Sequence, residues 1–305
     1  MKTEPINKPR YEYNKASEIV KGALSMSYKK VLTIQDISCV GQCSLTVALP
    51  ILSAAGFETC ILPSAVLSTH TAGFTGFTVR DLTEDIPAIA AHWRRENIRF
   101  DAVYTGYLGS AGQIDQVKEI IATLSAPDAV SIVDPAMADN GKLYPAFDGA
   151  YVEAMKTLAF SADIILPNIT EACFLTGLQY REEYDEAYIT ALLDAMTAAG
   201  AKTIVLTGVG YEPGQTGVVV RENGETRYYA HKKIAQGCHG TGDVYASAFV
   251  GALLHGHSAY DAAVIAADYT VRCIEITQGD ANHWYGVKFE LALPTYIRML
   301  GLQAT

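Results

Sequence analysis

The stretch "GTGDVYASAFVGALLHG", residues 240–256, joins a glycine-rich turn to a long apolar segment. The apolar part is dense in Ala, Val, Phe and Leu and contains no proline, which predicts a buried helix. The glycines free backbone N–H groups at the start of that helix, where unpaired donors and the helix dipole attract an anion. Asp243 lies in the first turn, so a carboxyl group stands beside a predicted anion site.

Two interpretations of Asp243 follow from this position. Aspartate is a common residue at helix starts, where it satisfies free backbone N–H groups. Alternatively, phosphoryl transfer to an alcohol needs amides that stabilise the transferring group and a carboxylate that accepts the hydroxyl proton. The chain has no G-x-x-x-x-G-K-[ST] motif, so any phosphates would be held by this other arrangement.

Short Val-, Ile- and Leu-rich strands alternate with helical patterns along the rest of the chain. This alternation predicts an α/β/α sandwich of three layers, in which helices cover both faces of a mainly parallel sheet. The strands are expected at 29–36, 58–63, 101–109, 129–135, 162–168 and 201–208, with a small β-hairpin excursion at 216–234 that turns at Asn223-Gly224. The helices are expected at 44–56, 85–97, 113–124, 149–161, 169–177, 186–200, 243–256, 258–277 and about 288–300.

The composition limits the domain organisation and the partners. The chain of 305 residues is 50% hydrophobic, and residues 28–305 are expected to form one domain. Residues 1–27 are polar and of mixed charge, which predicts a disordered or loosely docked leader and no signal peptide. The net charge of −10 argues against nucleic acid or an anionic membrane as the main partner. The six cysteines have no C-x-x-C spacing and indicate reduced thiols in the cytoplasm.

Polar residues follow several of the predicted strands, at the edge where parallel sheets bind ligands. In "PNITE", Asn168 and Glu171 are one helical turn apart and can face one site, with Glu171 holding Mg²⁺ through water. A capping box is the alternative interpretation of this pair. In "DPAMADNGKLY", Asp134 and Asp139 are either metal neighbours or part of the turn chemistry around Asn140-Gly141.

Five stretches together resemble the pyridoxal (vitamin B6) kinase family of the ribokinase-like superfamily: "GTGD", "PNITE", "DPAMADNGKLY", "TGYLGS" and "STHT". The resemblance runs in order from about Lys30 to the C-terminus. It implies an ATP-dependent kinase that phosphorylates the 5′-hydroxymethyl group of pyridoxal, pyridoxine or pyridoxamine. In that family's pattern, Asp243 is the base, and Gly240, Thr241 and Gly242 form the anion hole for the γ-phosphate.

The resemblance implies roles for further residues. Asn168 and Glu171 would lie along the triphosphate and its Mg²⁺, and Asp134 and Asp139 near the metal and a monovalent cation such as K⁺. The remaining implied contacts are Tyr144 with the phosphates, Thr207 and Thr241 with the nucleotide, Thr71 and Tyr107 with the pyridine ring, and Ser38, Val40 and Gly41 with the polar edge of the ring. The family is often dimeric, so a homodimer is also implied.

Two departures from the family pattern bear on substrate preference. The first loop, "IQDISCVGQC", is shorter than in many B6 kinases, so either Asp36 or Ser38 takes the position of the family's serine. In "STHT", Thr69 stands where asparagine is common, and His70 either contacts substrate or holds the loop. Three alternatives therefore stay open: a hydroxymethylpyrimidine kinase, a sugar kinase, or a B6-binding protein without turnover.

Overall fold

The computed structural model describes residues 28–234 and 239–302, and the predicted leader at 1–27 lies outside the described residues. A sheet of nine strands forms its centre, in the spatial order β11-β10-β9-β8-β5-β4-β1-β2-β3. The strands are β1 (Lys30–Ser38), β2 (Glu58–Leu67), β3 (Val79–Asp81), β4 (Phe100–Thr105), β5 (Ser125–Val133), β8 (Ile164–Ile165), β9 (Thr203–Thr207), β10 (Gln215–Glu222) and β11 (Glu225–Lys232).

The middle of the sheet is parallel and its margins are antiparallel. The six strands from β9 to β2 pair in parallel, as the alternation of strands and helices predicts. The predicted hairpin is present, with its turn at Asn223 and Gly224, both at positive φ. Because β10 pairs with β9, this hairpin extends the main sheet at one margin. The short β3 at the other margin was not predicted, and β8 is shorter than the strand expected at 162–168.

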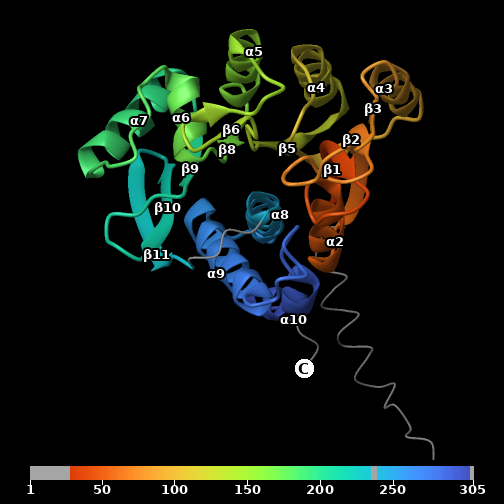
Figure 1. The fold of residues 1–305 in the computed structure, drawn as a ribbon. Helices are drawn as coiled ribbons and strands as arrows, with labels where there is room; N and C mark the ends of the chain where they lie inside the picture. Colours follow the sequence, from red (N-terminus) through yellow and green to blue (C-terminus); the bar gives the residue numbers. More distant parts are fainter. Residues whose placement is uncertain (1–27, 235–238, 303–305) are drawn as a thin grey trace, which may run out of the picture.

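Helices cover both faces of the sheet and complete the three predicted layers (Figure 1). One apolar core joins the sheet to α3 (Ile86–Arg95), α4 (Ala111–Leu124), α5 (Gly149–Ala159), α6 (Ile169–Thr176) and α7 (Glu186–Ala198). The other joins it to α2 (Leu45–Ala54), α8 (Thr241–Leu254), α9 (Ala259–Thr277) and α10 (Phe289–Met299). Side chains alternate between the two cores along the central strands, as Val103 and Tyr104 of β4 do.

A small second sheet forms within the stretch "DPAMADNGKLY". Its strands β6 (Ala138–Asp139) and β7 (Lys142–Leu143) pair antiparallel around Asn140 and Gly141, which both have positive φ. The turn chemistry expected at Asn140-Gly141 is therefore present. No helix of the described ranges is long and apolar enough to cross a membrane.

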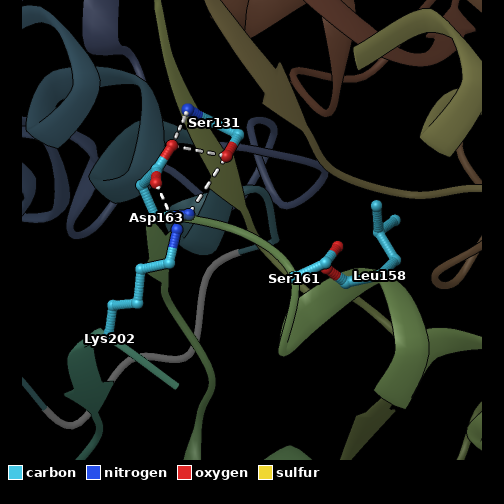
Figure 2. Close-up of polar contacts among 5 residues, drawn as sticks. All are labelled: Ser131, Leu158, Ser161, Asp163 and Lys202. Carbon is cyan, nitrogen blue, oxygen red and sulfur yellow. Dashed lines mark hydrogen bonds and ion pairs between the residues drawn. The ribbon is translucent and has the colours of Figure 1, made fainter. Parts of the chain in front are cut away.

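A cluster of polar contacts ties β5, β8 and β9 together near the amino ends of β8 and β9 (Figure 2). Asp163 accepts hydrogen bonds from the backbone and the hydroxyl of Ser131, at 2.9 and 2.8 Å, and pairs with Lys202 at 2.7 Å. Nearby, the Ser161 hydroxyl donates to the carbonyl of Leu158 near the end of α5. Burial alone raises the pKa of Asp163, but the contacts with Lys202 and Ser131 outweigh it and lower this pKa below its ordinary value.

We predict that Asp163→Asn lowers the thermal unfolding midpoint at pH 7 by about 2 to 4 °C. Since the folded-state pKa of Asp163 is depressed, its contribution exists above the unfolded pKa near 3.8 and disappears as pH falls through the folded value. Unfolding followed by circular dichroism at pH 7, 5 and 3 should show this loss. Asp128→Asn, at an exposed position of β5, the strand that holds Ser131, is the control. An equal destabilisation at all three pH values would contradict the prediction.

Candidate active site

A cavity of about 980 Å³ opens at the carboxyl edge of the parallel strands. Its wall includes most of the residues selected from the sequence: Ser38, Thr71, Tyr107, Asp134, Asp139, Tyr144, Asn168, Glu171, Thr207, Gly240, Thr241, Gly242 and Asp243. Val40 and Thr69 are not part of that wall. Val40 is 53% exposed, and its carbonyl accepts a hydrogen bond from the backbone N–H of His70. One cavity therefore brings together residues from seven separate stretches of the chain.

The helix start at "GTGD" is built as the sequence predicts. Gly240 is the N-cap of α8 in the left-handed conformation, with φ of 73°, and Asp243 lies in the first turn. Burial raises the pKa of Asp243 to about 7; the backbone of Ser44 opposes this shift by hydrogen bonding, and the nearby Asp36 adds to it. A carboxyl group with this pKa is half ionised near neutral pH, which is the range in which a general base works best.

Close approach of two loops explains why a glycine stands at position 240. A Cβ atom there would lie 1.9 Å from the carbonyl oxygen of Gln42, in the loop before α2. The neighbouring Ser44 has φ of 54°, an uncommon conformation for a residue other than glycine. The loop between β1 and α2 is thus pressed against the start of α8, and Ser44 faces Asp243 across the contact.

Asn168 and Glu171 form a complete capping box at the start of α6. The Asn168 side chain accepts from the Glu171 backbone N–H at 2.9 Å, and Glu171 Oε2 accepts from the Asn168 backbone N–H at 2.8 Å. Glu171 Oε1 also accepts from Met137 N at 3.1 Å, which fixes the carboxyl group against the β5–β6 loop. Both interpretations hold, because the capped pair also lines the cavity. With both oxygens engaged, Glu171 is best placed to reach a cation through water.

Acidic side chains crowd one side of the cavity. Burial and then the neighbouring carboxyls Glu171 and Asp243 raise the pKa of Asp134 well above its ordinary value. Burial also raises the pKa of Glu171 to about 7, although three backbone hydrogen bonds oppose the shift. Asp139 is exposed at the rim, where it accepts hydrogen bonds from Asn140. The described residues contain no group of three or more His, Cys, Asp or Glu side chains arranged to hold a metal ion by themselves.

The described wall of the cavity has no positive side chain of the lysine or arginine type. Its carboxyl groups are Asp36, Asp134, Asp139, Glu171 and Asp243, and its other titratable groups are histidines, tyrosines and one cysteine. The negatively charged carboxylates on the acidic side would therefore repel a polyphosphate bound here. A cation bound with the phosphates would compensate for this repulsion.

Asp36 and Ser38 both reach the cavity at the end of β1. The Ser38 hydroxyl donates to Asp36 Oδ2 at 3.0 Å, and both side chains are nearly fully buried. Burial raises the pKa of Asp36, while the hydroxyls of Ser44 and Ser38 oppose the shift. The two residues form one hydrogen-bonded pair, and both of them line the cavity.

His70 uses both ring nitrogens within the protein. Its Nε2 lies 2.7 Å from the Tyr285 carbonyl oxygen, and its Nδ1 accepts from the backbone N–H of Ala72 at 3.2 Å. The ring also packs so closely on Gly41 that a Cβ there would lie 2.2 Å from Cδ2. His70 therefore holds its loop, which was one of the two interpretations. Sequence patterns did not point to several other wall residues, among them Cys43, Ser44, Phe77, His231, Thr270 and Ile274.

Comparison with known proteins agrees with this geometry. The family model described as phosphomethylpyrimidine kinase matches residues 52–287. The chain belongs to that family. The expected enzyme class, a small-molecule kinase, is therefore confirmed, as is the expected α/β fold.

Individual relatives connect the chain to pyridoxal kinases. The pyridoxal kinase of Dictyostelium discoideum is 28% identical over 240 residues, which cover 73% of this chain and 77% of the relative. The crystal structure of pyridoxal kinase from Lactobacillus plantarum has 32% identity and a TM-score of 0.83, covering 90% of this chain and 98% of that one. A candidate phosphomethylpyrimidine kinase from Bacteroides thetaiotaomicron, solved with pyridoxal, has 35% identity and a TM-score of 0.83, covering 88% and 96%.

We predict that Gly240→Ala and Gly242→Ala differ sharply although both change the same turn. An added Cβ at Gly240 would meet the Gln42 carbonyl and sit at positive φ, whereas at Gly242 it would meet nothing within 4 Å. Gly240→Ala should lower the free energy of unfolding by about 2 kcal/mol or more, and Gly242→Ala by less than about 1 kcal/mol. Denaturant unfolding measures both. Similar losses in the two variants would show that the loop contact does not constrain position 240.

Proposed function

We propose that the chain is an ATP-dependent kinase for vitamin B6 vitamers, which transfers the γ-phosphoryl group to the 5′-hydroxymethyl group of pyridoxal, pyridoxine or pyridoxamine. The observation that carries the proposal is the position of Asp243 in the first turn of α8, inside the large cavity and beside the backbone amides of Gly240 to Gly242. The similarity to pyridoxal kinases, and to a relative solved with pyridoxal, supports the choice of substrate.

Asp243 would act as the general base. It accepts the proton of the hydroxymethyl group while that oxygen forms a bond to the γ-phosphorus, and the bond from this phosphorus to the oxygen of the leaving ADP breaks. The amides of residues 240–242 stabilise the negative charge on the transferring group, as an anion hole at a helix start does. Asn168, Thr207, Thr241 and Tyr144 would contact the nucleotide and its phosphates.

The acidic wall fits a divalent cation that enters with ATP. Magnesium is usually held by one or two carboxylates together with substrate phosphates and water, so it needs no site made of protein ligands alone. Asp134, Asp139 and Glu171 would hold it, with Glu171 acting through water. When bound, Mg²⁺ neutralises charge on the β- and γ-phosphates. The requirement for a monovalent cation such as K⁺ remains a prediction from the family resemblance.

The other side of the cavity would bind the substrate ring. Thr71 and Tyr107 line it together with the hydrogen-bonded pair of Asp36 and Ser38, which supplies polar groups for the edge of a pyridine ring. Hydroxymethylpyrimidine is the second candidate substrate, and the description of the matching family model favours it. It is also a small aromatic alcohol, so the same base and anion hole would serve it.

We also propose, on the family resemblance, that residues 28–305 form one ribokinase-like kinase domain, that the chain forms a homodimer and that it works in the cytoplasm. Nucleic acid and membranes are not proposed as partners, because the net charge of the chain is −10.

We predict that ADP is released from Mg·ATP in the presence of a B6 vitamer, and that Asp243→Asn lowers kcat by about 10²-fold or more, because the general base is lost. The assay compares pyridoxal, pyridoxine, pyridoxamine and hydroxymethylpyrimidine. Unchanged ATP affinity in the variant is the control. Turnover on the pyrimidine alone would favour the second candidate, and near-normal turnover by Asp243→Asn would remove Asp243 from the mechanism.

We predict that ATP without a divalent cation binds at least about tenfold more weakly than Mg·ATP at pH 8. The pKa values of Glu171 and Asp243 are each about 7, so both are mostly ionised at pH 8 and repel the phosphates. At pH 6 both are mostly protonated, and the difference should narrow. Calorimetric titration with and without EDTA measures it. Equal affinities at pH 8 would mean that the carboxyls do not face the phosphates.

A further inference from the structure

Three polar side chains lie in the core directly below the site, on the sheet face that α8 covers. Gln35 of β1, Tyr104 of β4 and Ser247 of α8 are all 0% exposed. Within the described residues, Gln35 Oε1, the Tyr104 hydroxyl and the Ser247 hydroxyl have no partner in hydrogen-bond geometry. Buried polar atoms are nearly always paired, so three together in one place need an explanation.

A hydrogen bond to Thr33 fixes the Gln35 side chain at one end of this group, and the oxygen of Gln35 is left without a partner. The Gln35 amide donates to the Thr33 hydroxyl at 2.9 Å, which orients its oxygen away from that contact. Position 106 leaves room for this orientation, because a Cβ at Gly106 would lie 2.6 Å from Gln35 Oε1. Ser247 and Gln35 lie next to the Tyr104 hydroxyl and act to lower its pKa as weak hydrogen-bond partners, although none of these contacts reaches full hydrogen-bond geometry. The three residues therefore form one polar column between the sheet and α8.

Ser247 differs from several threonines of the described helices in its hydrogen bonding. Hydroxyl side chains within a helix usually donate back to the carbonyl four residues earlier. Among the described helices, five threonines do so: Thr123, Thr176, Thr197, Thr270 and Thr277. The Ser247 hydroxyl does not donate to the carbonyl of Asp243, which is its counterpart four residues earlier. It is free to orient toward the column.

The column leads to the proposed base. Ser247 is one helical turn from Asp243, on the same face of α8. Burial, and then the carboxyls of Asp134 and Asp243, hold the pKa of Tyr104 well above its ordinary value, so its hydroxyl keeps its proton and remains a donor. The titratable groups that act on Asp243, or on which it acts, come from several elements: Asp36, Cys43, Tyr104, Asp134 and Tyr144. Of these groups, Tyr104 is fully buried in the core, whereas the other four line the cavity.

We propose that Tyr104 and Ser247 are positioning residues for Asp243: with Gln35 behind them, their hydroxyl dipoles form a buried polar column that stabilises the ionised, proton-accepting form of the carboxyl group. Burial and the neighbouring Asp36 oppose ionisation of Asp243, and the backbone of Ser44 favours it. The column would add a second influence in favour of the ionised form, from the side of the core. This inference rests on the proposed role of Asp243 as the base.

The test uses the full chain with ¹³C-labelled aspartate carboxyl groups, and Asp243→Asn assigns the Asp243 signal. Since hydroxyl dipoles favour the charged form, Tyr104→Phe and Ser247→Ala should each move the titration midpoint of Asp243 upward by about half a pH unit or more. The acid limb of the kcat/KM profile should move in the same direction. Tyr269→Phe is the matched control, because Tyr269 is also 0% exposed but donates to the Phe289 carbonyl at 3.1 Å.

Stability separates a positioning role from a packing role. Tyr104→Phe removes a hydroxyl without a partner, so its thermal midpoint should stay equal or rise, whereas Tyr269→Phe breaks a hydrogen bond and should lower it. An Asp243 midpoint that is unchanged in both column variants would overturn the proposal. If Tyr104→Phe does not fold, Ser247→Ala decides alone. If no vitamer is turned over, the proposed function fails, while the titration still decides whether the column acts on Asp243.

Discussion

The contact between the loop before α2 and the start of α8 is the constraint on which the rest of the site depends. Position 240 can approach the Gln42 carbonyl so closely only as glycine. This approach brings Ser44 to Asp243 and joins the first βα loop to a helix two hundred residues later along the chain. The proposed base, the proposed anion hole and the end of β1 proposed to bind the ring are therefore held by one tight backbone contact.

Unpaired negative charge is the second organising feature. Burial raises the pKa values of Asp134, Glu171 and Asp243, and at least one neighbouring carboxyl adds to each of these shifts, so the described wall favours protonation until a cation arrives. A cation bound with the phosphates would reverse this tendency and would favour ionised carboxyls, including the base. Nucleotide binding and activation of Asp243 as the proposed base would then be linked through the same electrostatic field, without a conformational change.

Much of this molecule could be predicted from its sequence, for physical reasons that differ between regions. The parallel sheet followed from strands buried on both faces, and the hairpin from Asn223-Gly224, because these patterns are local. The helix start at Gly240 and the capping box at Asn168 also depend on neighbours in sequence. Strand β3 and the extension of the sheet by β10 could not be predicted, since they depend on which strand is nearby in space.

The same distinction explains what was missed in the site. The sequence motif identified Asp243, but its environment comes from β1, β4, β5 and the loop before α2, each of which is distant along the chain. Ser247 and Tyr104 lie in apolar stretches where a lone hydroxyl carries no pattern, and only the folded structure places both of them in the core near the proposed base. A fold that tolerates three unpaired oxygens in its core gives up stability there. We expect such a loss of stability to be tolerated where the unpaired groups change the chemistry of a neighbouring residue. Asp243 is that neighbour, one helical turn from Ser247.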